Sequence, residues 1–504
     1  MQSNVMPNFL KKRAFLTPDR IAVYFENQTL TFKELYRSSA KTAGQLQGHG
    51  IQKDQFVGIL LKNQLDTVII LLALQLLGVR AVILNNRLTP SELAWQLEDS
   101  KASSVIVDDS FSELLAFFQG QQPSLSGMTV KQVFISNPKE ADILEEVNLA
   151  EICTIMYTSG TTGYPKGVIQ TYGNHWWSAV GSALNLGLSE HDSWLCSVPI
   201  FHISGYSILM KSIIYGMPMV LHKKFDAKKA LADIKEKRIT IMSVVGTMLT
   251  EMVELLGKEQ QLPDYFRCFL LGGGPAPLPL LQACVEKGAP VFQTYGMTET
   301  SSQIVTLSPE YSMVKLGSAG KPLFPSEIKI EVERGRVAAP GQAGEIVVRG
   351  PNVTSGYLFR SDVTMEKIRD GWLYTGDIGY MDDEGFLYVL DRRSDLIISG
   401  GENIYPAEVE GIILSHPGVS EAGVIGIEDD KWGQVPVAVA VRRDDQLSEE
   451  ELREFCQERL AKYKVPKAVY FVEKLPRNAS KKLLRRELRE WLNEGRIHHE
   501  HSEN

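Results

Sequence analysis

Short apolar runs alternate with longer amphipathic stretches over roughly the first 315 residues of the chain. The runs at 57–61, 81–84 and 104–107 are mostly apolar and have the length of buried strands. Between them, apolar residues recur with helical spacing, as they do at 66–77. Strands that alternate with helices form βαβ units around a largely parallel sheet. We therefore expect an α/β fold for this part of the chain.

The pattern changes after about residue 315. Apolar and polar residues then alternate at period two, with Gly and Pro between the alternating segments, which is typical of antiparallel strands with one buried face. We therefore expect a small antiparallel sheet or barrel over about 316–391. The alternating segments lie at 327–332, 345–349 and 386–390.

A dense run of charged residues at 391–395 lies between two apolar strands and indicates a domain boundary. Residues 1–391 are expected to form one large N-terminal domain, which includes the β-rich part. Strand and helix patterns alternate again over 392–490 and predict a small α+β domain. The last residues, 491–504, are charged and contain several histidines, and we expect a disordered tail without an assigned function.

Composition and charge narrow the class of protein. A chain of 504 residues exceeds the size at which a single core stops growing, and 44% hydrophobic with 23% charged residues is ordinary for a soluble globular protein. A net charge of −8 argues against a nucleic-acid binder. The cysteines show no C-x2-C spacing, so neither a zinc site nor a disulfide framework is indicated, and a reducing, cytoplasmic compartment is expected. We expect no signal peptide and no membrane insertion, because no h-region and no bilayer-length apolar run is present.

The clearest chemistry lies in a loop that follows the apolar strand at 152–157. Its glycines let the backbone approach a ligand closely, its hydroxyls and backbone N–H groups suit an anion, and Lys166 supplies a cation. The P-loop of kinases and GTPases is excluded, because its lysine opens a helix, whereas Lys166 follows Pro165. A surface linker is the alternative, but strand, loop and lysine in this order favour polyphosphate binding. The loop residues concerned are Thr158, Ser159, Gly160, Thr161, Thr162, Gly163 and Lys166.

Two further strands run into small polar turns. The strand at 268–271 ends in the glycines 272–274, which allow flat, close approach of a base, although the third glycine of a dinucleotide fingerprint is missing. The strand at 291–297 leads to Thr298 and Glu299, a hydroxyl next to a carboxylate of the kind that binds Mg²⁺ beside phosphate. Ordinary turns are the alternative interpretation of each stretch taken alone.

Single polar residues give weaker signals. His202 follows a strand at the carboxyl end, where α/β sheets bind ligands, although a lone histidine among apolar residues is more often a satisfied core group. Asp377 follows a glycine and is either a turn aspartate or an acceptor for ribose hydroxyls. The basic loop at 476–485 has the composition of solvated surface.

Taken in order, six motifs resemble those of the adenylate-forming enzymes, the superfamily of acyl-CoA synthetases and adenylation domains. Within that superfamily, four further stretches resemble the o-succinylbenzoate–CoA ligases of menaquinone synthesis. The resemblance extends from about residue 5 to 490. The six motifs lie at 157–167, 201–205, 293–300, 374–377, 391–406 and 476–485, and the four stretches at 173–179, 270–280, 297–309 and 317–323.

The resemblance implies a fold and a reaction. The fold would be a large N-terminal domain, with two parallel-sheet α/β lobes and a small β-barrel, followed by a small mobile C-terminal domain. In the reaction, a carboxylate attacks the α-phosphate of ATP to give an acyl-adenylate and pyrophosphate, and the coenzyme A thiol then displaces AMP. Mg²⁺ is the implied metal, and the partners are small molecules. A homo-oligomer is compatible with the sequence.

The resemblance also implies roles for single residues. The loop after the first strand would hold the β and γ phosphates, the glycines 272–274 with Tyr295 and Gly296 would border the adenine, and Thr298 would contact the α-phosphate. Glu299 would help to hold Mg²⁺, and Lys482 matches the lysine that promotes adenylation. The remaining implied roles are ribose binding by Asp377 and Arg392, a pantetheine tunnel at Gly400 and Gly401, and an acyl pocket with His202, Ser204, Gly205, Gly296 and Ser302.

Two positions depart from the superfamily pattern. Ser394 stands where Asp or Lys is usual in the hinge, and Lys481 stands where Gly usually precedes the adenylation lysine, so Lys481 competes with Lys482 for that role. Three alternatives stay open: a synthetase for another aryl or fatty acid, an amino-acid adenylation enzyme that serves a carrier protein, and a non-catalytic nucleotide sensor. The second is disfavoured because those enzymes usually have Asp at the position of His202.

Overall fold

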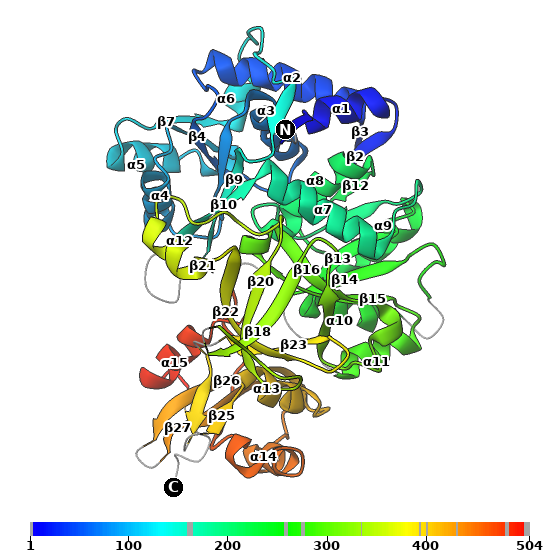
Figure 1. The fold of residues 1–504 in the computed structure, drawn as a ribbon, viewed down its shortest axis with the longest axis vertical. Coiled ribbons are helices and arrows are strands. Elements are labelled where there is room, and N and C mark those ends of the chain that lie inside the picture. The colour runs from blue at the N-terminus through cyan, green and yellow to red at the C-terminus, as the bar shows by residue number, and fades with distance from the viewer. Residues whose placement is uncertain are drawn as a thin grey trace.

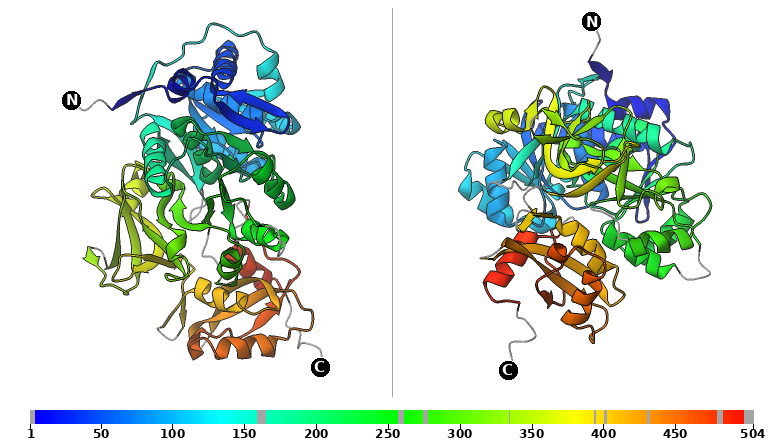
Figure 2. Two further views of the ribbon diagram at one scale, coloured as in Figure 1. Left: turned by 90° about the vertical axis from the view of Figure 1, so that its right-hand side faces the viewer. Right: turned by 60° about the horizontal axis from the view of Figure 1, so that its bottom comes forward.

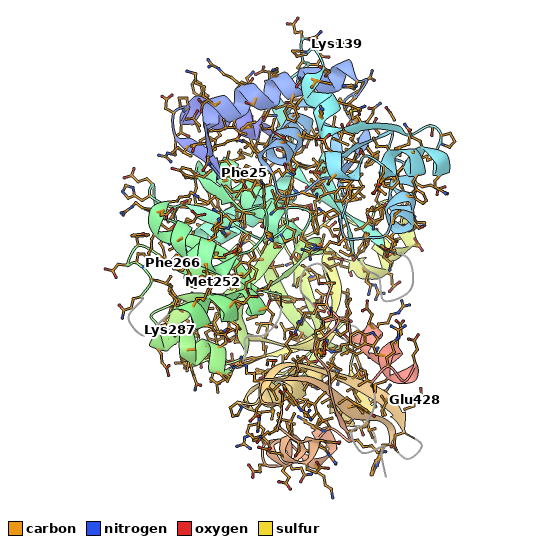
Figure 3. All side chains as sticks on the ribbon, turned by 180° about the vertical axis from the view of Figure 1, so that it is seen from behind. Phe25, Lys139, Met252, Phe266, Lys287 and Glu428 are labelled. Atoms are coloured by element: carbon orange, nitrogen blue, oxygen red, sulfur yellow. The ribbon has the colours of Figure 1, made fainter. Side chains whose placement is uncertain are left out.

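The computed structural model describes residues 4–158, 165–256, 261–273, 278–333, 335–392, 395–399, 402–429, 432–478 and 483–497. The molecule is elongated, with the N-terminal elements at one end and the C-terminal ones, orange to red, gathered at the other (Figures 1 and 2). Lys139 and Glu428 lie toward these opposite ends in Figure 3. Among the described residues, no helix is both long and apolar enough to cross a membrane.

The first lobe is built on a sheet of six described strands, all parallel except for the pairing of the first two. In spatial order these are β10 (Lys166–Thr171), β9 (Ile152–Thr158), β5 (Arg80–Ile83), β4 (Phe56–Leu60), β6 (Ser104–Val107) and β7 (Ser126–Thr129). The helices of this part are α1 (Phe9–Leu16), α2 (Phe32–Gly48), α3 (Leu65–Leu77), α4 (Pro90–Asp99), α5 (Leu114–Gln121) and α6 (Val130–Ile135). A separate two-stranded ribbon pairs β1 (Val5–Pro7) with β8 (Glu146–Asn148).

The second lobe is built on the parallel part of a larger sheet. Its strands in spatial order are β15 (Val291–Met297), β14 (Cys268–Gly272), β13 (Ile241–Val245), β11 (Trp194–Cys196), β12 (Met219–Leu221) and β2 (Ile21–Phe25), with β3 (Gln28–Thr31) antiparallel at the edge. Its helices are α7 (Tyr172–Leu186), α8 (Ile203–Tyr215), α9 (Ala227–Glu236), α10 (Gly246–Leu255) and α11 (Leu278–Glu286).

Antiparallel strands extend the same sheet beyond β15, so the β-rich segment is joined to the second lobe by hydrogen bonds. They follow in the order β16 (Ser302–Leu307), β17 (Ser318–Pro322), β23 (Leu387–Arg392), β22 (Trp372–Met381), β20 (Gly344–Arg349), β18 (Glu327–Glu333) and β19 (Arg336–Val337). Strand β21 (Ile368–Arg369) pairs with β22, and α12 (Ser361–Lys367) precedes it. The antiparallel pattern expected after residue 315 is confirmed, and closure into a barrel stays a prediction.

The C-terminal strands form a sheet of their own. It consists of β25 (Glu402–Ile404), β24 (Ile397–Ser399), β27 (Gly433–Arg442) and β26 (Val419–Asp429), with β28 (Val469–Phe471) parallel to β27. The helices α13 (Pro406–Leu414), α14 (Glu449–Gln457) and α15 (Arg485–Asn493) belong to this part. Short 3₁₀ turns complete the chain: η1 (Asp109–Phe111), η2 (Thr298–Thr300), η3 (Pro309–Tyr311) and η4 (Lys462–Lys464).

One hydrophobic core joins the two lobes. Every residue of α3 except Asp66 is buried, and Gln75 of this helix donates to the hydroxyl of Tyr206 on α8, 2.7 Å away. The buried residues Phe25, Met252 and Phe266, labelled in Figure 3, belong to the same core. Because α3 is apolar all round, it is stable only where both lobes cover it. The expected α/β class with an α+β end is confirmed.

Candidate active site

The polyphosphate-type loop is closed by the hairpin of β9 and β10. Thr158 pairs with Lys166 and Tyr157 with Gly167, so the two ends of the loop lie side by side. Lys166 begins a strand, which agrees with the exclusion of a P-loop helix; the strand itself was not predicted. The hydroxyl of Tyr157 donates to Asp99 over 2.8 Å and fixes one side of the stem. The loop residues Ser159, Gly160, Thr161, Thr162 and Gly163 lie outside the described part of the chain.

Thr298 and Glu299 lie in η2, directly after β15, and are half-buried. The hydroxyl of Tyr357 donates to Oε1 of Glu299 over 3.1 Å. Burial raises the pKa of Tyr357, so its hydroxyl keeps its proton and stays a donor. A carboxylate held at the end of a strand, next to a hydroxyl, has the oxygen chemistry that Mg²⁺ prefers. Among the described residues, no group of three or more His, Cys, Asp and Glu side chains is placed to hold a metal ion.

Tyr295, Asp377 and Arg392, which the resemblance places around the nucleotide, lie close together. The Tyr295 hydroxyl donates to Oδ2 of Asp377 over 2.8 Å, and Asp377 is the strand partner of Arg392 between β22 and β23. Asp377 is 7% exposed, so its buried polar oxygens need hydrogen-bond donors there. Gly376 before it has φ +78°, a conformation that turns the backbone just ahead of the carboxylate. A ribose could be held here by its two hydroxyls.

Glycines are required where backbones approach closely around the site. A Cβ on Gly296 would lie 2.1 Å from the carbonyl oxygen of Ser302, and a Cβ on Gly205 would lie 2.3 Å from that of Pro199. Gly272 ends β14, and Gly273 follows it with φ +89°. Gly274 lies outside the described residues.

The predicted acyl-pocket residues lie at the start of α8 and at the β15–β16 turn. His202 is the N-cap residue of α8, Ser204 is exposed in its first turn, and Ser302 accepts a hydrogen bond from Ser207, one turn further along the helix, over 3.2 Å. Burial, and next the nearby charge of Arg87, lower the pKa of His202 to about 4. His202 is therefore neutral at pH 7 and carries no charge that could pair with an anionic ligand.

Lys211 is a residue that the sequence analysis missed. It lies on α8 seven residues after Ser204 and four after Ser207, which places all three on one face of the helix. It is only 1% exposed, and its Nζ donates to Oε1 of Gln303 over 3.1 Å and lies 5.0 Å from the Trp194 ring centroid.

Within the described chain, no carboxylate lies within ion-pair distance of Lys211. Burial lowers its pKa to about 7, because the charged form has lost its hydration. An ammonium in this position is suited to an incoming anion. The available signal was a single lysine in the otherwise apolar run of α8.

Hydrogen bonds fix the two ends of the basic loop at 476–485. Leu484 donates its backbone N–H to the carbonyl of Pro476 over 2.9 Å, which closes the loop at its base. Arg485 makes two hydrogen bonds to Glu410 on α13, 2.9 and 2.8 Å long. The candidate lysines Lys481 and Lys482 lie outside the described residues, as do the hinge residue Ser394 and the tunnel glycines Gly400 and Gly401.

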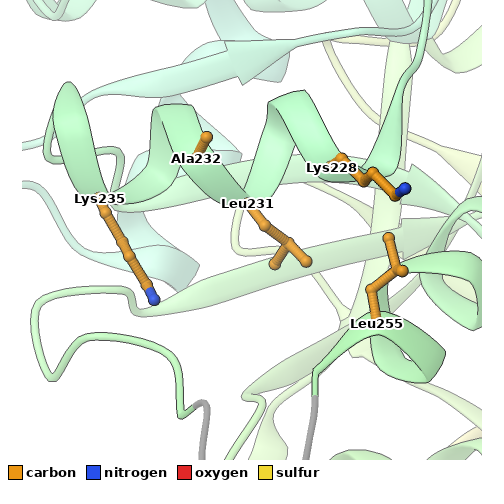
Figure 4. Close-up of a pocket in the computed structure, with 5 residues that line it drawn as sticks. All are labelled: Lys228, Leu231, Ala232, Lys235 and Leu255. Carbon is orange, nitrogen blue, oxygen red and sulfur yellow. The ribbon is translucent and has the colours of Figure 1, made fainter.

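Two surface hollows do not coincide with the predicted acyl pocket. One, of about 310 Å³, lies between α9 and α10, and Lys228, Leu231, Lys235 and Leu255 are among its lining residues (Figure 4). None of the predicted site residues lines it. The other, of about 480 Å³, borders the back of the site, because Tyr357, the partner of Glu299, is part of its wall.

Family models match most of the chain. Residues 10–358 match the family "AMP-binding enzyme", and residues 408–482 match "AMP-binding enzyme C-terminal domain". A curated relative, the 2-succinylbenzoate–CoA ligase of Geobacillus kaustophilus (strain HTA426), is 59% identical over 485 residues, which cover 96% of this chain and 97% of the relative.

Solved structures of the o-succinylbenzoate CoA synthetase of Bacillus subtilis are similar over nearly the whole chain. The complex with the acyl-adenylate intermediate OSB-AMP has a TM-score of 0.91 at 53% identity and covers 96% of this chain and 98% of that one. The complex with ATP and magnesium ion has a TM-score of 0.91 at 52% identity, with 96% and 100% covered. A double mutant bound with the product analogue OSB-NCoA is 52% identical, with 98% and 99% covered, but has a TM-score of 0.75.

Proposed function

We propose that this chain, which belongs to the AMP-binding enzyme family, ligates 2-succinylbenzoate to coenzyme A through an acyl-adenylate and releases pyrophosphate and AMP. The observation that carries this proposal is the match, at 53% identity and a TM-score of 0.91, to an enzyme solved with OSB-AMP. ATP and magnesium ion bind the same relative. The reaction would serve menaquinone synthesis in the cytoplasm.

The first half of the reaction requires the substrate carboxylate to be aligned with the α-phosphate of ATP. We propose that Thr158, Lys166 and the loop between them bind the β and γ phosphates, while Thr298 contacts the α-phosphate. The Tyr295–Asp377 pair, with its 2.8 Å hydrogen bond, supports a ribose site, because an oriented carboxylate has two oxygens that can accept from hydroxyls. Lys482 would be the point charge between the substrate carboxylate and the α-phosphate. Reactions of this kind depend mainly on positioning and on charge stabilisation.

Glu299 is the proposed protein ligand of Mg²⁺, and its contact with Tyr357 supports an orientation fixed before the metal arrives. When bound, Mg²⁺ would neutralise phosphate charge and stabilise the departing pyrophosphate. The residues of this chain keep the carboxylate oriented and the adjacent Thr298 in place.

The second half of the reaction needs Lys482 to leave and the thiol to enter. We propose that residues 1–391 and 392–490 form two domains that alternate about 391–395, which would bring Gly400 and Gly401 toward the acyl-adenylate. Two values support this proposal: the TM-score is 0.91 to the OSB-AMP complex and 0.75 to the OSB-NCoA complex, at nearly equal identity. Equal sequence similarity with unequal superposition is what a rigid-body rearrangement produces.

The second carboxylate of the substrate sets the specificity. 2-Succinylbenzoate reacts at one carboxylate and presents the other on its ring. We propose that this ring carboxylate is drawn toward Lys211, which is one helical turn beyond Ser207 and its partner Ser302. The rise per residue puts Lys211 about 6 Å further along α8 than Ser207. The flexible four-carbon side chain of Lys211 can span that distance and bring its ammonium to the level of Ser207 and Ser302. An ion pair with the substrate would restore the favourable surroundings that the buried ammonium lacks.

The direct test is product analysis. The protein would be incubated with ATP, Mg²⁺, coenzyme A and 2-succinylbenzoate, and nucleotides and thioester would be identified by mass spectrometry. We expect AMP and the thioester in equal amounts. ADP in place of AMP, or AMP without a thioester, would contradict the proposed chemistry.

A further inference from the structure

We propose that Gln170 is a positioning residue of the active site, which ties the strand after the polyphosphate loop to the turn that bears Thr298 and Glu299. The inference rests on the proposed function of that turn and adds the element that holds it in place. Gln170 lies on β10, four residues after Lys166, and is fully buried.

The turn is held from outside at four successive carbonyl groups. Gln170 Nε2 donates to the carbonyl of Thr298 over 2.9 Å, and the backbone N–H of Thr354 donates to that of Glu299 over 2.7 Å. The next two carbonyls, of Thr300 and Ser301, accept from Asn352 Nδ2 at 3.0 Å and from Ser178 Oγ at 2.7 Å. These donors come from β10, from the segment after β20 and from α7, so three parts of the fold converge on a single turn.

The backbone of the turn is strained, which explains why it needs external donors. Ser301 has φ +52° and Ser302 φ +106°, and neither is a glycine. Side chains beyond Cα make such angles costly, and they persist where the surroundings over-determine the conformation, most often at functional sites. Released from its donors, the turn would relax, and Thr298 and Glu299 would move with it.

Gln170 is itself oriented by a chain of hydrogen bonds. The hydroxyl of Thr154, on the neighbouring strand β9, donates to Oε1 of Gln170 over 2.8 Å and lies 3.1 Å from Nε2 of His175. Burial lowers the pKa of His175 to about 3, so the ring is neutral and can donate one proton to Thr154. This chain fixes which end of the amide faces Thr298: the NH₂ group must point at the carbonyl. Both ends of the Gln170 amide are thus hydrogen-bonded within the core, to Thr154 and to Thr298, which favours a single conformation of this side chain.

A matched control exists elsewhere in the molecule. Gln45 on α2 is 1% exposed, and its Nε2 likewise donates to backbone carbonyls, those of Phe134 and Ser136, at 2.8 and 2.9 Å. It anchors α6 and the residues after it, away from the turn. Gln45→Leu and Gln170→Leu remove similar hydrogen bonds from similarly buried sites, so loss of stability alone affects both variants.

The experiment compares Gln170→Leu, Gln45→Leu and the unaltered protein. Pyrophosphate release with 2-succinylbenzoate gives kcat and KM, calorimetry gives the affinity for ATP with Mg²⁺, and thermal melts report folding. We expect kcat of Gln170→Leu to fall about 10²-fold, as for a displacement of about 1 Å near reacting groups. The affinity for ATP should change far less, and Gln45→Leu should keep the kcat of the unaltered protein. Equal kcat values for the two leucine variants would overturn the inference.

Gln170→Glu keeps the shape of the side chain, so it tests the same role even if Gln170→Leu does not fold. Its carboxyl group, when protonated, can donate to the Thr298 carbonyl, and when ionised it cannot. Burial raises the pKa of such a group, so kcat relative to the unaltered protein should fall as the pH rises. For Gln45→Glu, kcat relative to the unaltered protein should not change with pH. A pH-independent ratio for Gln170→Glu would contradict the positioning role. If the unaltered protein releases no pyrophosphate with 2-succinylbenzoate, it is the proposed function that fails.

Discussion

Replacing Lys211 with methionine tests whether this buried cation selects the substrate. Methionine keeps the length and the apolar stem but removes the charge, and the Gln303 Oε1 that accepts from Lys211 keeps the hydroxyl of Ser182 as a partner at 3.2 Å. The fold should therefore tolerate the change. The informative substrate pair is 2-succinylbenzoate and 4-oxo-4-phenylbutanoate, which is the same keto acid without the ring carboxylate.

The expected magnitude follows from burial. Lys211 is 1% exposed, so a carboxylate that meets it is shielded from water, and removing one partner of such a buried charge pair costs about 2–5 kcal/mol. That range corresponds to a loss of about 30- to 5,000-fold in kcat/KM. The loss should appear with 2-succinylbenzoate only. The value for 4-oxo-4-phenylbutanoate should stay constant, because this acid has nothing to pair with the ammonium.

Lys211→Met should lower kcat/KM with 2-succinylbenzoate but raise the thermal stability of the protein. Burial holds the pKa of Lys211 at about 7, below the ordinary lysine value of 10.5, so the unfolded chain binds this proton more tightly than the folded one. Lys211 therefore destabilises the fold most below pH 7, and the penalty fades as the pH rises toward 10.5. Thermal melts of Lys211→Met should show a higher Tm than the unaltered protein at pH 7, with a difference that shrinks at high pH.

The assay is pyrophosphate release with each acid over a pH series. For the unaltered protein, kcat/KM with 2-succinylbenzoate should decline as the pH rises through about 7, because only the protonated lysine attracts the carboxylate. If Lys211→Met loses activity equally with both acids, Lys211 is a structural residue and the reasoning is refuted.

Three further predictions concern the nucleotide site. Asp377→Asn should raise KM for ATP about tenfold or more, because hydrogen bonds to a charged group contribute about 1.5–3 kcal/mol. Thermal melts should show that the variant remains folded. Gly296→Ala should abolish activity and lower Tm, since a Cβ would lie 2.1 Å from a backbone carbonyl oxygen; an active, stable variant would contradict the geometry. Lys482→Ala should lower adenylation by about 10²–10³-fold and spare thioester formation from supplied acyl-adenylate, whereas Lys481→Ala should affect neither, and the reverse result would reassign the lysine.

Sequence patterns predicted the elements whose signals are local. The spacing of Thr31 and Glu34 predicts a capping box, and the two residues form one at the start of α2. The Glu26–Asn27 pair between two short apolar runs predicts a hairpin, and β2 and β3 turn at Glu26, which has φ +51°. These features depend on side chains three or four residues apart, so the sequence contains all their partners. The resemblance implied that Tyr295 and Asp377 both border the nucleotide, whereas their mutual hydrogen bond, which spans 82 positions, is visible only in the structure.

Other features depend on partners that the sequence does not place. Strand β10 was missed because Lys166–Thr171 has large apolar side chains only at Val168 and Ile169, and it is recognisable mainly by its pairing with β9. Lys211 looked like an ordinary helix lysine, and only packing against Trp194 and Gln303 reveals its isolation from carboxylates. His202 was expected in the acyl pocket, but its position in the sequence does not show that burial lowers its pKa and makes it neutral at pH 7.

Pyrophosphate release with a panel of carboxylates, each with and without coenzyme A, distinguishes ligation of 2-succinylbenzoate from the alternative activities. The panel contains 2-succinylbenzoate, benzoate, a medium-chain fatty acid and a mixture of amino acids. We expect turnover with 2-succinylbenzoate and with none of the other acids. Free AMP should accumulate only when coenzyme A is present. Faster turnover of a fatty or simple aryl acid would contradict the substrate, and no turnover with any acid would contradict the adenylation chemistry itself.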